Sequence, residues 1–122
     1  MIIEHMTARG HEAVYPTARI LTHWWRKLNA ELFDKALRPC QLATPIFTIE
    51  FADAQALCWP LEHGIVRIEL DAAREYTRSS MLASLAHEMV HQWQHQNGLP
   101  TNHGQEFQGW VDRIETKLGV RV

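Results

Sequence analysis

Apolar residues recur every three or four positions in three stretches of the chain, and each pattern predicts an amphipathic helix. We expect these helices at about residues 17–35, 79–97 and 103–118. Gly98 and Pro100 form a stop signal after the second helix. The apolar positions of the three helices are, in order, Ile20, Leu21, Trp24, Trp25, Leu28, Leu32 and Phe33; Leu82, Leu85, Ala86, Met89, Val90 and Trp93; and Phe107, Trp110, Val111, Ile114 and Leu118.

Between the first two helices the composition shifts toward residues that favour strands. Alternating and short apolar runs predict strands at residues 46–51, 56–59 and 65–70, with a turn at His63 and Gly64. Their close spacing along the chain favours antiparallel pairing. The sequence therefore predicts an α+β protein, with an N-terminal helix, a small, mainly antiparallel sheet of about three strands, and two further helices.

Length and composition indicate a single domain over residues 1–122, in which residues 1–15 are weakly patterned. The hydrophobic content of 46% and charged content of 21% are ordinary for a soluble globular protein. No apolar run approaches the length of a membrane span, and the N-terminus lacks the pattern of a signal peptide, which favours the cytoplasm. Cys40 and Cys58 lack C-x-x-C spacing, so we expect two buried small hydrophobic residues without a disulfide.

The second predicted helix contains the motif H-E-x-x-H, formed by His87, Glu88 and His91. Histidines four residues apart lie one turn apart on one helix face, so both rings can bind one Zn²⁺. Glu88 follows the first histidine and points to the side of the metal, where a carboxylate can take a proton from water. A helix with merely exposed histidines would give this glutamate no role. The motif therefore predicts a catalytic zinc site, with Glu88 as general acid and base.

A catalytic zinc site needs a third protein ligand. His95 is excluded, because at 1.5 Å per residue it lies about 12 Å along the helix from His87. His103 is the best candidate, since the loop before it lets the chain turn back toward the helix. The other candidates are Glu106 and Glu115 in the last helix and, less favoured, His23 and His63.

Four segments of the chain carry a family resemblance: N-A-E-L-F at 29–33, H-E-M-V-H-Q-W-Q-H at 87–95, N-G-L-P at 97–100 and H-G-Q-E-F at 103–107. Together they resemble the SprT-like (Spartan-type) zinc metallopeptidases over roughly residues 17–118. The resemblance implies a zincin-like core in which His87, His91 and His103 bind Zn²⁺ and Glu88 is catalytic. Family members often carry a C-terminal zinc ribbon with paired C-x-x-C motifs. None occurs in this sequence, so the resemblance implies a minimal version.

The leading hypothesis for function is zinc-dependent hydrolysis of peptide bonds in a protein or peptide substrate. We expect the substrate to lie extended beside an edge strand, for which residues 65–70 are the candidate. The resemblance also implies action on DNA-associated proteins, although the net charge of −2 and pI of about 6.4 do not favour DNA binding.

The sequence is also compatible with other functions. The main alternative is a nucleic-acid-binding adaptor with a structural zinc, whose basic edge would consist of Arg67, Arg74 and Arg78. A metal-loaded scaffold without turnover and a hydrolase of non-peptide amides are further alternatives.

Overall fold

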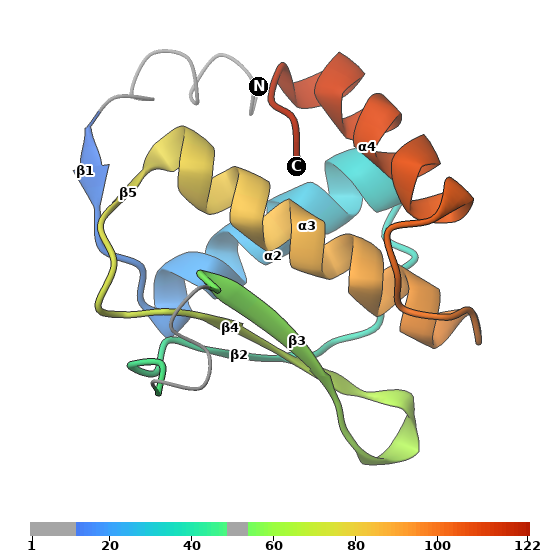
Figure 1. Ribbon diagram of the computed structural model, residues 1–122, viewed down its shortest axis with the longest axis horizontal. Helices are drawn as coiled ribbons and strands as arrows, with labels where there is room; N and C mark the ends of the chain where they lie inside the picture. Colours follow the sequence, from blue (N-terminus) through green and yellow to red (C-terminus); the bar gives the residue numbers. More distant parts are fainter. Residues whose placement is uncertain (1–11, 49–53) are drawn as a thin grey trace.

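Helix α3 lies in the middle of the fold, with α2 behind it, α4 beside it and the larger sheet below it in the view of Figure 1. The structure is a computed structural model that describes residues 12–48 and 54–122. Its helices are α2 (Ala18–Phe33), α3 (Arg78–Gln96) and α4 (Gln105–Leu118), with a short 3-10 helix, η2 (Glu62–Gly64). Its strands are β1 (Ala13–Val14), β2 (Gln41–Ala43), β3 (Ala56–Pro60), β4 (Val66–Leu70) and β5 (Tyr76–Thr77). This architecture confirms the predicted α+β class.

The three predicted helices are confirmed, and local capping sets their ends. The Thr17 hydroxyl accepts a hydrogen bond from the Ile20 amide at the start of α2. Thr77 and Ser80 form a reciprocal capping box at the start of α3. Gly119 ends α4 in the left-handed conformation, with φ of 72°, which a glycine adopts without steric cost.

The larger sheet has the order β2-β4-β3 and mixes two kinds of pairing. Strands β3 and β4 are antiparallel, as predicted, from the pair Ala56 and Leu70 to the pair Pro60 and Val66. Strand β2, however, runs parallel to β4. A separate two-stranded sheet of β1 and β5, which the sequence pattern did not predict, lies at the N-terminal end of α3.

The prediction of a strand at residues 46–51 is wrong for the residues of this segment that the structure describes. Residues 46–48 belong to no strand, residues 49–51 lie outside the described residues, and the strand in this part of the chain is β2. The described residues form a loop instead, and two hydrogen bonds hold it in place. The Ala72 amide donates to the Pro45 carbonyl, and the Phe47 amide donates to the Asp71 carboxylate. Ile46 is 74% exposed, so its apolar character does not indicate burial.

Helix α3 is the centre of the hydrophobic core, because it contacts both other long helices and strands β1, β3, β4 and β5. The core positions predicted for the three helices are buried, except for Ile20 and Trp93, which are partly buried and pack against the core. Strand β4 contributes Val66, Ile68 and Leu70 from one face, as alternation along a strand requires. Within residues 12–48 and 54–122, no helix has both the length and the apolar composition to cross a membrane.

We predict that Asn29→Ala lowers the free energy of unfolding by roughly 1–3 kcal/mol, the cost of leaving buried polar groups unpaired. Asn29 is buried in α2, where its side-chain oxygen accepts from the Leu37 amide at 3.0 Å and its side-chain nitrogen donates to the Leu37 carbonyl at 3.1 Å. Urea denaturation of both proteins measures the change. Exposed Asn97→Ala is the comparison, and equal losses for the two variants would contradict the role of Asn29.

Candidate metal centre

Three histidines from two segments meet beside the middle and C-terminal part of α3. His87 and His91 lie one turn apart on α3, and His103 lies in the connection just before α4. One ring nitrogen from each histidine lies within 4.8 Å of the other two, and the Nε2 atoms of His91 and His103 are 3.2 Å apart. Tetrahedral zinc with bonds of about 2.0–2.1 Å would separate two ligand nitrogens by about 3.3 Å. The three side chains therefore fit a zinc ion.

A buried aromatic ring packs against the three histidines. The centroid of the Phe107 ring lies 4.4 Å from that of His103, 4.9 Å from that of His87 and 5.0 Å from that of His91. Phe107 is only 2% exposed, so it shields this side of the cluster from water. The sequence pattern marked Phe107 as a core residue of the last helix. Its contact with the histidines follows from tertiary packing.

The surroundings favour neutral imidazoles in the cluster. Burial, followed by the charges that His91 and His103 would carry, lowers the pKa of His87 to about 4. Burial also lowers the pKa of His91. A histidine must be unprotonated at the nitrogen that binds a metal. Both α3 histidines are neutral at neutral pH, so each leaves one ring nitrogen unprotonated.

Glu88 lies beside the histidine cluster without belonging to it. Glu88 is 7% exposed, and its Oε2 atom is 4.0 Å from Nε2 of His87. Burial raises the pKa of Glu88 to about 7, because the charged carboxylate is disfavoured away from water. A carboxyl group with such a pKa can both take up and release a proton near neutral pH.

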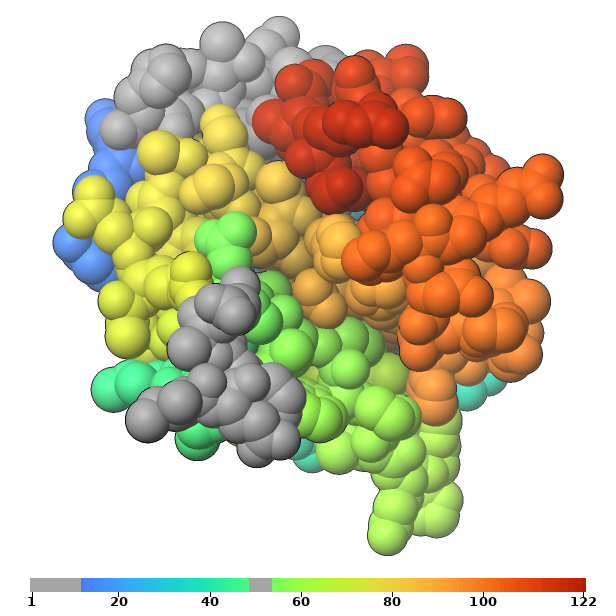
Figure 2. All heavy atoms as spheres, in the orientation of Figure 1, coloured from blue at the N-terminus to red at the C-terminus, as the bar shows by residue number. Residues whose placement is uncertain are grey.

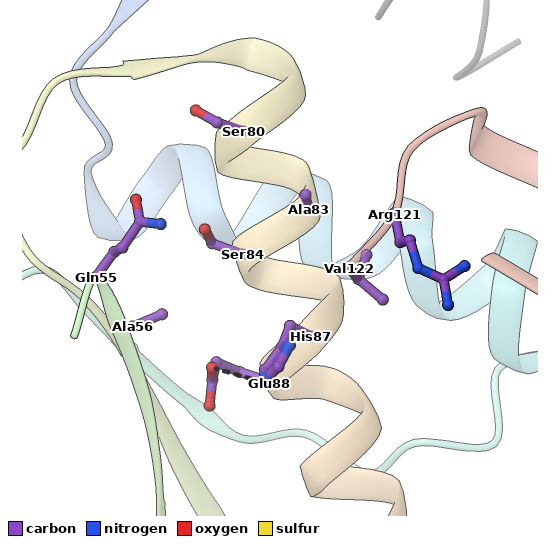
Figure 3. A pocket seen from close by; sticks show the side chains of 9 residues that line it. All are labelled: Gln55, Ala56, Ser80, Ala83, Ser84, His87, Glu88, Arg121 and Val122. Carbon is purple, nitrogen blue, oxygen red and sulfur yellow. Dashed lines mark ion pairs between the residues drawn. The ribbon is translucent and has the colours of Figure 1, made fainter. Parts of the chain in front are cut away.

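His87 and Glu88 line a cleft of about 340 Å³. Figure 3 shows the Glu88 side chain pointing toward the β3 side of α3, with Arg121 and Val122 on the other side of the helix. On the molecular surface, part of α3 remains visible between β3 and the C-terminal segment (Figure 2). The remaining lining residues are Gln55, Ala56, Ser80, Ala83 and Ser84.

A glutamine connects the two segments that carry the histidines. Oε1 of Gln94 lies 2.8 Å from Nδ1 of His91, and Nε2 of Gln94 donates to the Asn102 carbonyl at 3.0 Å. Gln94 is 1% exposed. No sequence motif marks Gln94, although its position three residues after His91 puts the two side chains on the same helix face.

The other candidate ligands lie apart from this cluster. In the described part of the chain, the one group of three ligand atoms close enough for a shared metal is that of His87, His91 and His103. The four other candidates, and the excluded His95, have other surroundings. Glu106 is exposed, Glu115 pairs with Arg121, His23 packs edge-on against Trp24, the side chain of His63 is 87% exposed in η2, and His95 occupies the last turn of α3.

The three arginines of the alternative hypothesis do not form a free basic edge. Arg67 forms an ion pair with Glu69 at 2.9 Å, and Arg74 forms one with Asp71 at 3.3 Å. The guanidinium of Arg78 lies over the ring of Trp24. Carboxylates thus already offset two of the charges that nucleic-acid binding would use.

The two cysteines are free and partly buried. Burial raises the pKa of both thiols to about 12, and for Cys58 the carboxylate of Glu88 adds to the effect. Both thiols are therefore neutral near pH 7. They pack against the core as small apolar groups.

The fold and the site define an α+β domain in which two histidines of the central helix and one from the connection before α4 form a cluster suited to a metal ion, with a buried carboxyl group beside it. Residues 21–122 match the sequence profile of the SprT-like family, and the chain belongs to that family. Neither the curated proteins nor the solved structures provide a match. Family membership and the histidine cluster are both consistent with a metallopeptidase-type domain.

We predict that the protein binds one Zn²⁺ per chain and that His103→Ala weakens this binding by more than 100-fold. Changes in groups that only orient a ligand typically cost about 10- to 100-fold in affinity, and loss of a ligand should exceed that. Competition with a chromophoric chelator measures the affinity. His95→Ala serves as the control, since it removes a histidine of α3 that lies outside the cluster. An equal loss in both variants would contradict the assignment of His103.

Proposed function

We propose that this protein is a zinc-dependent metalloendopeptidase that hydrolyses peptide bonds, with Glu88 as general acid and base. The observation that carries the proposal is the combination of three convergent imidazoles with a buried carboxyl group, beside a cleft. A purely structural zinc site would gain nothing from a carboxyl group held at the cleft wall. Membership of the SprT-like family supports the same conclusion.

The proposed ligands are His87, His91 and His103. When bound, zinc supplies a Lewis acid that makes water a stronger nucleophile at neutral pH and polarises a peptide carbonyl. Glu88 takes the proton of the attacking water and then gives a proton to the leaving amine nitrogen. Its burial suits both steps, because it brings the pKa of the carboxyl group close to the pH at which both transfers must occur.

The structure changes the expected position of the substrate. Residues 65–70 were the candidate edge strand, but β4 is central and pairs with β2 and β3 on its two sides. Strand β3 lies at the end of the sheet order, and Gln55 and Ala56, at its start, line the same cleft as Glu88. We therefore propose that an extended peptide binds beside β3 through main-chain hydrogen bonds.

A requirement for DNA is not part of this proposal. The net charge is −2, and Arg67 and Arg74 are paired with carboxylates. The chemistry proposed for the cleft acts on the peptide bond itself and is the same whether or not the protein substrate is bound to DNA.

We expect Glu88→Gln to retain zinc and to lower the rate of peptide hydrolysis by about 10²–10⁴-fold, the usual contribution of general acid–base catalysis. The amide has nearly the shape of the carboxyl group but cannot accept the proton. Cleavage of unfolded casein by the zinc-loaded protein measures the rate, with metal content checked in the same samples.

Glu62→Gln is the matched control, because it makes the same change at a fully solvated glutamate of η2. It should cleave at the wild-type rate. Wild-type cleavage by zinc-loaded Glu88→Gln would exclude the role given to Glu88.

A further inference from the structure

We propose that Gln94 is a positioning residue, which fixes the ring tautomer of His91 and holds the backbone beside His103 at the same time. This inference concerns the zinc site of the proposed function and rests on it. Gln94 touches neither the proposed metal position nor the cleft, and acts through the two histidines that it connects.

The orientation of the Gln94 side-chain amide follows from its partner in the connection between α3 and α4. The Asn102 carbonyl oxygen can only accept a hydrogen bond, so the group that faces it at 3.0 Å must be the NH₂ of Gln94. The Gln94 oxygen then has to face His91, where it lies 2.8 Å from Nδ1. A backbone carbonyl thus decides which end of the amide the histidine meets.

The amide orientation in turn decides the tautomer of His91. An amide oxygen only accepts, so Nδ1 of His91 must carry the proton that forms this hydrogen bond. In the neutral ring, Nε2 then has a free lone pair. Nε2 is the atom that lies 3.2 Å from Nε2 of His103, at the proposed metal position. The hydrogen bond therefore keeps the correct nitrogen free before any metal binds.

The same glutamine holds the segment that carries His103. Its side chain binds the Asn102 carbonyl, and its own main-chain carbonyl accepts from the Leu99 amide at 2.9 Å. The side chain of Asn102 in turn accepts from the Gly104 amide at 2.9 Å. The backbone is therefore fixed on both sides of His103, and one of the two anchors is Gln94.

Burial makes this arrangement specific. Gln94 is 1% exposed, so water cannot replace its hydrogen bonds. Gln92, two residues earlier on α3, offers a close comparison. It is 3% exposed and also makes two side-chain hydrogen bonds, accepting from Trp25 Nε1 and donating to the Arg38 carbonyl, without contacting any histidine of the cluster.

The experiment compares wild type, Gln94→Met and Gln92→Met. Each methionine variant keeps the side-chain length and loses two side-chain hydrogen bonds of a buried glutamine, so a general loss of stability affects both. Zinc affinity is measured by chelator competition. The tautomer of His91 is measured in the metal-free protein by two-bond ¹H–¹⁵N correlation spectra, above the pKa range of the histidines. Circular dichroism confirms that each variant is folded.

We expect His91 of metal-free wild type to carry its proton on Nδ1. In Gln94→Met we expect a mixture of tautomers and zinc binding that is weaker by about 10- to 100-fold, whereas Gln92→Met should match wild type in both measurements. Gln94→Glu should restore the Nδ1–H form, because a carboxylate accepts the same hydrogen bond. This variant and the wild-type spectrum keep the test decisive if Gln94→Met does not fold.

An Nε2–H tautomer in metal-free wild type would overturn the proposal, as would equal zinc affinities for Gln94→Met and Gln92→Met. These outcomes are distinct from failure of the proposed function. A wild-type protein that binds no zinc would remove the peptidase proposal, and the tautomer measurement would still decide what Gln94 does to His91. Zinc binding without proteolysis would likewise leave the role of Gln94 intact.

Discussion

The burial of helix α3 is the constraint on which the rest of this structure depends. The helix packs against α2, α4 and strands of both sheets, so most of its circumference is covered by other elements. His87 lines the cleft, on a side of the helix that neighbouring elements leave open, and His91 lies one turn farther along the helix. Because neighbouring elements hold the helix on its other sides, the two imidazoles have fixed positions before a metal arrives. Such preorganisation reduces what binding has to reorder.

Polar side chains of α3 link this core to the connections around it. Gln92 and Gln96 bind backbone groups of the segment after α2, at Ala36 and Arg38, while Gln94 binds the segment before α4. Each amide uses its nitrogen as donor to a backbone carbonyl, which a buried glutamine needs in order to offset its desolvation. One helix thereby fixes both neighbouring connections, and the second of these carries the third histidine.

Burial also sets the protonation of the site, and it acts in opposite directions on its two kinds of group. Loss of water lowers the pKa of His87 to about 4 and raises that of Glu88 to about 7, since in each case the charged form is disfavoured. His87 and His91 are thus neutral, as metal ligands must be, while the carboxyl group of Glu88 titrates near neutral pH. Phe107 of α4 packs against all three histidines, so the last helix contributes to the burial of this cluster as well as to stability.

The sequence alone determined the three helices, the β3–β4 hairpin and the candidate residues His87, Glu88 and His91, because helical periodicity, capping residues and a one-turn spacing are local properties. It favoured His103 without excluding Glu106 or Glu115, since the path of the connection before α4 is not encoded in any spacing. Tertiary structure decided that the strand near residue 46 lies instead at β2 and pairs in parallel, that β4 is central, and that Gln94 and Phe107 contact the histidines. These features depend on which distant backbone groups form hydrogen bonds with one another and on how the helices pack. No local pattern in a single sequence determines either.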